Sequence, residues 1–449
     1  MGTALFTAVT GLKAFQRSLD VIANNIANVN TVGYRGARVL FGDLFSQTLE
    51  GASAPDGTFG GTNPSQVGLG VGIATIDIDH GQGSLNTTGF ASDLAIQGAG
   101  FFILNNGAAN TFTRDGSFSV NANGFLIDPA TGLFVQGFGL DANGNVDTQA
   151  EVGNLQIPLG GAAIVQATTL TNLVGNLSAD ATIGDPSAVP PIPADSVTRR
   201  IRVFDSLGTA REIELTFTKI AQVDDGGTLF NAWEWDATFD GTSVVNLGGF
   251  TGTAVLLFNP DGSLAKSGID DGAGTVNPLS PGDFNASIPL SAFSGDSIPV
   301  TPFEFNIDFS SVSSLSGLSE LTNPNQDGFP LGILENFNIG ESGVINGIFS
   351  NGLTRVLGQV ALATFSNIAG LERAGNNQFR QSSSSGMAQI GQSNTGGRGT
   401  ISGGVLEGSN VDLGTEFSNM IITQRGFQAN ARTITTADTL LGEAVNLVR

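Results

Sequence analysis

The sequence is poor in reactive and charged side chains. Its 449 residues include no cysteine, one histidine, one tyrosine and two tryptophans, and only 13% are charged. The absence of cysteine excludes disulfides, thiol catalysis and cysteine–zinc sites, and a single histidine, His80, excludes a histidine dyad or a histidine-based metal site. A long chain without cysteine is typical of proteins that act outside the cytoplasm without disulfides. We therefore predict that the protein is not an enzyme and needs no cofactor or metal.

Long apolar runs and excess positive charge are missing too. No stretch offers ~18 consecutive apolar residues, so we expect no membrane insertion. The first 30 residues are amphipathic and are interrupted by Lys13, Arg17 and Asp20, which differs from the apolar block of a cleaved leader. Lys and Arg total 18 against 40 acidic residues, and no basic stripe suggests a nucleic-acid partner. If the protein is extracellular, we expect export without a cleaved signal peptide.

Charge is distributed unevenly along the chain. Residues 1–50 carry a net charge of +1 and residues 406–449 carry −2, so the total of −22 lies almost wholly in the middle. Nearly neutral ends can pack closely, whereas an acidic middle should face solvent and resist clumping.

Glycine and phenylalanine, by contrast, are abundant, with 63 and 31 copies. Together with alternating apolar patterns and many Asn-Gly and Asp-Gly pairs, this composition favours β-structure with tight turns. The middle of the chain is therefore expected to be mainly β.

Each end of the chain carries an apolar stripe with alternating steps of three and four, which is typical of the a/d seam of a coiled coil. The stripes predict helices over residues 3–29 and from about 411 to the end. We expect them to pair as a stem and to form subunit contacts, although each helix docking on its own globular domain is an alternative. In the second stripe Gln424 and Asp438 occupy seam positions and make it imperfect. The first stripe consists of Leu5, Ala8, Leu12, Phe15, Leu19, Ile22, Ile26 and Val29, and the second of Leu413, Phe417, Met420, Phe427, Ala431, Ile434, Leu441, Val445 and Val448.

Between the ends, the pattern predicts nested, discontinuous domains. Residues 31–75 look irregular because of their Gly and Pro content. Residues 199–219 alternate as a hairpin across Ser206-Leu207-Gly208, and Trp233 and Trp235 should share one strand face. The expected parts are a helical core (1–32 with 408–449), extended connecting segments (33–75 with 380–407), a β-rich shared domain (76–165 with 331–379) and an inserted outer β domain (166–330).

Other patterns have two interpretations. The asparagines at the end of the first stripe either end the helix or make hydrogen bonds between helices and subunits that set register. Asp141 to Asp147 resembles part of a calcium loop, but its surroundings favour a hairpin turn. Acidic pairs such as Asp224-Asp225 and Asp270-Asp271 lie in Gly-rich turns, where a solvated loop is the simpler interpretation.

Two long motifs at opposite ends resemble the signatures of bacterial flagellar rod and hook proteins. The first is Ser18-Leu-Asp-Val-Ile-Ala-Asn-Asn-Ile-Ala-Asn-Val-Asn-Thr-Val-Gly-Tyr-Arg35, and the second combines Glu407-Gly-Ser-Asn-Val-Asp-Leu413 with Gln424-Arg-Gly-Phe-Gln-Ala-Asn-Ala-Arg432. The interior segment Arg114-Asp-Gly-Ser-Phe118 resembles the β-domain shared by hook and distal-rod proteins, and Phe204-Asp-Ser-Leu-Gly208 resembles the extra domain of hook proteins. Rod relatives are expected to be shorter and to lack the inserted unit. The signature residues are Asn24, Asn25, Asn28, Asn30, Gly33, Tyr34, Asn410, Asp412, Gln424, Arg425 and Asn430.

The resemblance implies a structural subunit of the flagellar hook, which polymerises into a curved, flexible tube that acts as a universal joint and transmits torque from the rod and motor to the filament. It implies self-association and contacts with the distal rod protein, the hook–filament junction proteins, the hook cap protein, the hook-length control protein and the flagellar type III export apparatus. Phe41 and Phe45 resemble a short aromatic export motif. A rod-type or hook-associated protein is the nearest alternative, and a secreted β-rich adhesin is a more distant one.

Overall fold

The computed structural model describes residues 2–54, 60–107, 109–141, 144–161, 163–225, 228–245, 253–270, 276–279, 284–288 and 303–447. Its described part is mostly β, with two long helices, α1 (Gly2–Ala27) and α2 (Leu413–Leu447), close to the two ends of the sequence. The expected fold class is thereby confirmed. The chain forms two compact units, unit 1 (Met1–Pro158, Asn336–Gly347 and Thr354–Arg449) and unit 2 (Leu159–Glu335 and Ile348–Leu353). The finer division into four nested parts stays a prediction.

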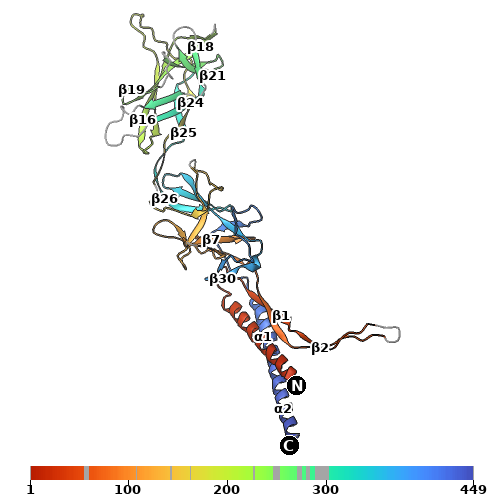
Figure 1. Ribbon diagram of the computed structural model, residues 1–449. Coiled ribbons are helices and arrows are strands. Elements are labelled where there is room, and N and C mark those ends of the chain that lie inside the picture. The colour runs from red at the N-terminus through yellow and green to blue at the C-terminus, as the bar shows by residue number, and fades with distance from the viewer. Residues whose placement is uncertain are drawn as a thin grey trace. The chain divides into compact units, whose positions relative to one another are not determined.

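The two helices lie side by side and run in opposite directions (Figure 1). The helix α1 ends at Ala27, two residues before the predicted end, and the chain then turns through Gly33, whose φ is +67°. Glycine adopts this left-handed backbone conformation without a Cβ penalty, which explains its place after the helix. In the part of the chain that the structure describes, neither helix has the length and hydropathy needed to cross a membrane.

The prediction that residues 31–75 lack regular structure is wrong. Strand β1 (Ala37–Asp43) pairs antiparallel with β4 (Val71–Ile78), and β2 (Ser46–Glu50) pairs with β3 (Ser65–Gly68). The result is a two-stranded ribbon, which we call the ribbon, beside the helices (Figure 1). Its side chains are mostly exposed on both faces. A strand without a buried face needs no apolar alternation, so its sequence carries little strand signal.

The rest of unit 1 is a β-body in which β28, β11, β7, β8, β31 and β30 are neighbours in that order. The late segment expected to be extended supplies strands that pair with earlier ones: β33 with β6 and β34 with β5. The two ends of the chain therefore meet in this body as well as in the helices. The strands are β5 (Leu85–Thr87), β6 (Leu94–Gln97), β7 (Phe101–Asn105), β8 (Asn110–Thr113), β9 (Ser119–Val120), β10 (Leu126–Ile127), β11 (Phe134–Phe138), β12 (Gly153–Asn154), β27 (Val344–Phe349), β28 (Thr354–Val360), β29 (Leu362–Thr364), β30 (Glu372–Gly375), β31 (Gln378–Arg380), β32 (Gln389–Gly391), β33 (Thr400–Gly403) and β34 (Val405–Glu407).

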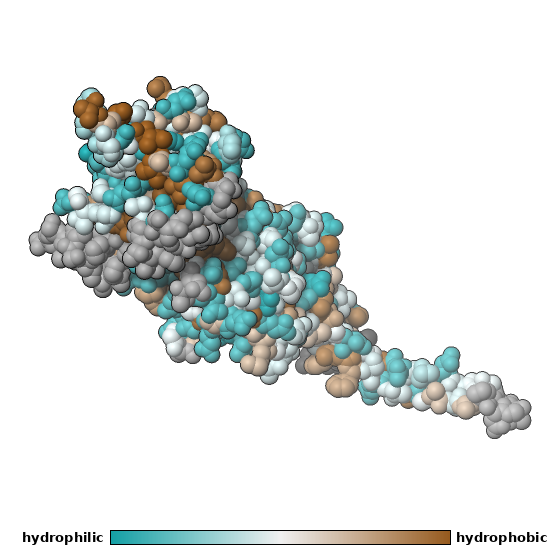
Figure 2. All heavy atoms as spheres, turned by 90° about the horizontal axis from the view of Figure 1, so that it is seen from above, coloured by the Kyte–Doolittle hydropathy of each residue, from teal (hydrophilic) through white to brown (hydrophobic). Residues whose placement is uncertain are grey.

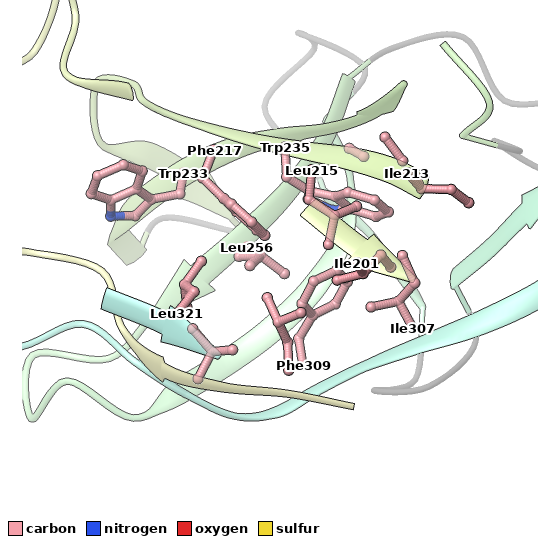
Figure 3. Packing of buried hydrophobic residues seen from close by; sticks show 14 of the residues in the cluster. Ile201, Ile213, Leu215, Phe217, Trp233, Trp235, Leu256, Ile307, Phe309 and Leu321 are labelled. Carbon is pink, nitrogen blue, oxygen red and sulfur yellow. The ribbon is translucent and has the colours of Figure 1, made fainter. Parts of the chain in front are cut away.

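Most strands of unit 2 form two sheets around one core, whereas β13 and β26 pair with each other outside these sheets. One sheet has the order β15-β16-β18-β20-β21-β22, and the other has the order β23-β24-β14-β25. Side chains from both sheets meet in one buried cluster that includes Trp235 and Phe309 (Figure 3), whose ring centroids are 4.9 Å apart. The strands are β13 (Ala163–Gln166), β14 (Leu170–Asn176), β15 (Ser196–Phe204), β16 (Ala210–Lys219), β17 (Val223–Asp225), β18 (Thr228–Phe239), β19 (Thr242–Ser243), β20 (Thr253–Phe258), β21 (Leu264–Asp270), β22 (Val276–Leu279), β23 (Phe284–Ile288), β24 (Phe303–Ser313), β25 (Glu320–Gln326) and β26 (Phe329–Ile339).

The predicted hairpin of unit 2 is confirmed. Strands β15 and β16 pair with Phe204 opposite Ala210. The turn is held by the buried Asp205, whose Oδ1 accepts hydrogen bonds from the backbone N–H groups of Leu207 and Thr209. An aspartate that caps its own turn in this way specifies where the strands reverse.

Candidate functional site: the stem and its junction

The helices α1 and α2, which we call the stem, touch through small side chains. Buried positions on the contact face of α1 include Ala8, Gly11 and Ser18. A Cβ added to Gly11 would lie 3.0 Å from the side chain of Asn430, and one added to Gly426 would lie 2.7 Å from the ring of Phe15. The two glycines therefore allow the helices to approach closely.

At several positions the buried face of each helix lies one residue before the predicted seam. On α2 the buried residues Thr423 and Ala437 take the places that the stripe assigned to Gln424 and Asp438, which are both exposed. The polar interruptions of the second stripe therefore lie outside the contact within the chain.

The predicted seam residues consequently differ in burial. Among those whose side chains the structure describes, Ala8 and Ile22 are buried; Leu5, Leu12, Phe15, Leu19, Ile26, Val29, Met420, Phe427, Ala431 and Ile434 are half-buried; and Leu413, Phe417 and Leu441 are exposed. The side chain of Val445 and the whole of Val448 lie outside the described residues. Large apolar side chains on one flank of α2 are thus left uncovered in the single chain.

The asparagines at the end of α1 have distinct partners. The buried Asn25 donates from Nδ2 to Ala37 O at 2.7 Å and to Glu416 Oε1 on α2 at 3.2 Å. Asn28 donates to Asn24 Oδ1 at 2.7 Å, which holds the last helical turn, and Asn30 is exposed. The structure therefore contains both kinds of contact that the sequence left open: helix termination and hydrogen bonding between helices.

Where the stem meets the β-body, one buried carboxylate pairs with two buried guanidinium groups, a set that we call the junction triad. Glu407 Oε1 lies 2.8 Å from Arg35 Nη2, and Glu407 Oε2 lies 3.2 Å from Arg114 Nη1. The three side chains are 0%, 1% and 6% exposed respectively. Burial lowers the pKa of Arg114 to about 10, although Glu407 opposes that shift. An ion pair with so little solvent depends on both partners, since removal of one leaves an uncompensated buried charge.

The segment between α1 and the ribbon, residues 28–36, which we call the signature loop, lies against the junction triad. The Gly33 N–H donates to Glu407 O at 2.7 Å, and a Cβ at Gly33 would lie 2.6 Å from Asp115 N. Tyr34 donates its hydroxyl hydrogen to Asn24 Oδ1 at 3.2 Å, and the guanidinium carbon of Arg373 lies 5.3 Å from the centre of the Tyr34 ring. At position 33, no residue larger than glycine fits beside the backbone of Asp115.

The other signature residues start α2 and fix the segment before it. Asn410 Oδ1 accepts from Gly36 N at 2.8 Å, and Asn410 Nδ2 donates to Asp79 O at 2.9 Å. Asp412 Oδ1 accepts from Thr415 N at 2.8 Å, as an N-cap does, and this hydrogen bond lowers the pKa of the Asp412 carboxyl. These contacts join the N-terminal and C-terminal signatures.

The remaining predicted residues lie at the surface or along the stem. Arg425 is exposed, and Asn430 is half-buried and donates to Gly426 O at 3.0 Å. The exposed fractions of Phe41 and Phe45 are 44% and 89%, and the ring centre of Phe41 lies 5.6 Å from that of Phe15. The Asp141–Asn145 turn is closed by Asn145 N donating to Asp141 Oδ1 at 2.8 Å, although residues 142 and 143 lie outside the described part.

Sequence reasoning missed the surroundings of His80. The imidazole packs against the rings of both Phe101 and Phe379, at centroid distances of 6.2 and 6.0 Å, beside a cavity of about 290 Å³. Burial, together with the positive charges of Arg35 and Arg114, lowers the pKa of His80 to about 4. A lone histidine gives no signal in the sequence of the two arginines that the fold brings beside it.

Four family models match the chain, and all describe flagellar rod or hook proteins. Residues 5–35 match the flagella basal body rod protein, 95–171 the flagellar hook protein FlgE/F/G D1 domain, 176–329 the flagellar basal body protein FlaE D2 domain, and 402–447 the C-terminal part of the flagellar basal body rod FlgEFG proteins. The models define the class as axial proteins of the bacterial flagellum.

Individual relatives narrow that class. The flagellar hook protein FlgE of Treponema pallidum is 39% identical over 100% of both chains, and that of Escherichia coli is 32% identical over 99% of this chain and 100% of its own. A crystal structure of Helicobacter pylori hook protein FlgE2 matches 70% of this chain and 98% of its own, with 15% identity and a TM-score of 0.46. The chain thus belongs to the flagellar hook protein FlgE family. It is a structural protein of the flagellar hook and not an enzyme.

One comparison corrects the expectation about rod relatives. The flagellar basal-body rod protein FlgG of Bacillus subtilis is 27% identical over 99% of both chains, so a rod-named relative carries a region of equal length. The inserted unit alone therefore does not separate hook from rod proteins, whereas the higher identity to FlgE proteins does.

Proposed function

We propose that this protein polymerises into a curved, flexible tube outside the cell that transmits torque from the rod and motor to the filament. The observation that carries the proposal is the uncovered apolar flank of α2. Leu413, Phe417 and Ile421, spaced by four residues, are 39%, 50% and 52% exposed. Full burial of such a side chain contributes roughly 1.5–3 kcal/mol, and about half of that remains to be gained here, so a second copy that covers all three would still bind with useful energy.

Exposed apolar side chains are not confined to the helices. Brown patches interrupt the hydrophilic surface that Figure 2 shows, and many large apolar residues of both units are exposed. Contiguous exposed apolar patches are typical of surfaces that bind another protein. The strong net charge of −22 favours solubility and opposes unspecific clumping.

The seam residues of both stripes are proposed as subunit contacts, and the signature residues as the framework that holds them. We propose that the four nested parts divide into a helical layer whose contacts between subunits stay fixed and β-rich layers that slide against their neighbours. The helices would hold constant contacts, while Gly-rich β-domains with polar surfaces slide between contacts of similar energy as the tube rotates. The terminal helices would become fully ordered only on assembly.

The proposed partners, besides further copies of the chain, are the distal rod protein, the hook cap protein, the hook–filament junction proteins and the hook-length control protein. Export would use the flagellar type III apparatus without a cleaved signal peptide. The exposure of Phe45, at 89%, supports the proposal that Phe41 and Phe45 form an export motif, because such a motif must be accessible.

Electron microscopy of the purified, concentrated protein tests the proposal. We expect curved tubes from the unaltered chain. The double variant Phe417→Ser/Ile421→Ser should remain monomeric, whereas Gln428→Ser, an exposed change on the same helix, should assemble. Straight rods or persistent monomers from the unaltered chain would contradict the proposed function.

A further inference from the structure

The stem has a second flank, where α1, α2 and the ribbon enclose a groove of about 230 Å³ that we call the stem groove. Its apolar lining includes Val21, Val39, Phe41 and Ile422. Phe41 and Ile422 are 44% and 67% exposed. The stem groove is separate from the flank formed by Leu413, Phe417 and Ile421.

Glu416 also lines this groove and has one unused acceptor. Its Oε1 accepts from Asn25 Nδ2 at 3.2 Å, whereas its Oε2 is buried and accepts no hydrogen bond among the described residues. Burial raises the pKa of this carboxyl, and the Asn25 hydrogen bond only partly opposes the rise. A carboxylate oxygen that has lost water without gaining a donor is costly, so the groove favours an occupant that brings a donor or a positive charge.

The chain itself carries a surface with the matching chemistry. Phe6, Val9 and Lys13 follow one another at helical spacing on the face of α1 that points away from α2. Phe6 and Val9 are 57% and 38% exposed, and Lys13 is exposed. Two apolar side chains followed by an ammonium group complement a groove with an apolar lining and a carboxylate.

We propose that the stem groove of one copy receives the Phe6–Val9–Lys13 face of a second copy, with the ammonium group of Lys13 pairing with the carboxyl group of Glu416. This inference rests on the proposed function and names the residues that meet in it. Because the two surfaces differ, the contact is heterologous, and repetition of a heterologous contact builds a helix or a ring rather than a closed dimer.

The same two surfaces cannot meet within one chain. Gly11 faces Asn430 and Gly426 faces Phe15, so the antiparallel register places position 422 opposite position 19. Val9 is therefore about ten residues, roughly 15 Å along the helix, from Ile422 of its own chain. A disulfide requires Cα atoms within about 7 Å, so a bond between these positions reports two copies.

The cysteine-free background permits a direct test on the full-length chain. Val9→Cys/Ile422→Cys should give a ladder of covalent oligomers when tubes are oxidised and none when dilute monomer is oxidised. The matched control is Val9→Cys/Gln428→Cys, whose second cysteine is exposed on α2 outside the groove. Tubes that form from the cysteine variant without a ladder, or an equal ladder from the control, would overturn the inference while the proposed function stands.

A charge exchange provides the second measurement. Lys13→Glu and Glu416→Lys should each raise the critical concentration for assembly on the order of tenfold, and the double exchange should restore much of the loss. Glu416→Gln, which keeps an acceptor for Asn25, should weaken assembly without altering the helix content of the monomer. If the losses of Lys13→Glu and Glu416→Lys simply add in the double exchange, the proposed pairing is wrong. Failure of the unaltered chain to form tubes would contradict the proposed function itself.

Discussion

Unit 2 and the stem bury their apolar residues in opposite ways. Unit 2 encloses its largest side chains: Trp233 and Trp235 are 0% and 2% exposed. The stem buries Ala8, Ser18 and Thr423 and leaves the larger Phe417 and Ile422 at the surface. A core that buries its own aromatic side chains stabilises a single chain. Helices that contact each other through small residues leave their large apolar side chains exposed, where another surface can cover them. The comparison supports the proposal that the stem, unlike unit 2, is completed by assembly.

Truncation of the unit 2 core should give the largest effect. Trp235→Ala removes a fully packed indole, and we expect a loss of about 3–5 kcal/mol in the free energy of unfolding. Both tryptophans lie on β18, so the fluorescence of the remaining Trp233 reports unit 2 alone during urea unfolding. Leu318→Ala is the control, since that side chain is 91% exposed and its loss should change little. Equal effects of the two substitutions would contradict a closed core.

Breaking the junction triad should affect unit 1 and spare unit 2. Glu407→Gln leaves two buried guanidinium groups without their counter-charge, at an expected loss of about 3–5 kcal/mol. Circular dichroism should show the loss of helix at lower urea, while tryptophan fluorescence keeps its midpoint. Glu214→Gln removes the exposed partner of Arg200 and should cost less than about 1 kcal/mol. A shift of the fluorescence midpoint by Glu407→Gln would show that the two units unfold together.

Two glycines of α2 should respond to alanine with opposite signs. At Gly426 the new methyl group would meet the Phe15 ring, and overpacking should cost about 1–3 kcal/mol. At Gly442 nothing lies within 4 Å, so alanine should stabilise the helix by about 0.5–1 kcal/mol. The measurement is the helical unfolding midpoint of each variant. If both changes stabilise α2, the close contact at Gly426 does not exist in solution.

The smallest effect is a pH dependence in unit 1. The pKa of His80 is about 4 in the folded chain, below its usual 6.5, so the unfolded chain binds this proton more readily. The free energy of unfolding should therefore fall as pH drops from 6.5 towards 4. His80 is only partly buried, which reduces the expected contribution to about 1 kcal/mol. His80→Gln should flatten this part of the profile, and an unchanged slope in the variant would contradict the assignment.

The sequence predicted the elements whose pattern reflects their own burial. The hairpin at Asp205, the tryptophan pair and both helices belong to this group, because one-sided or closed packing leaves a periodic signal. The strands of the ribbon were not predicted, since they have no buried face and therefore no periodic apolar pattern. The stem seam was placed one residue off because hydropathy ranks leucine and phenylalanine above the glycines and alanines that close contact selects.

The residues of the candidate site likewise fall into those with a signal in the sequence and those without one. The signature residues were found by resemblance, and the stripes by periodicity, but the pairing of Glu407 with Arg35 and Arg114 has no local signal. Glu407 lies 372 and 293 positions from Arg35 and Arg114, and only the three-dimensional fold brings them together.

The junction triad also sets an order of events for chain synthesis. Arg35 and Arg114 are made early, but their shared carboxylate comes from Glu407 near the end of the chain. Until residue 407 emerges, both guanidinium groups lack the partner that lets them leave water, and the signature loop lacks the carbonyl that holds Gly33. In a nascent or truncated chain the junction triad therefore cannot form. The segment around Glu407, near the end of the sequence, completes the packing of the segment around Arg35, near its beginning.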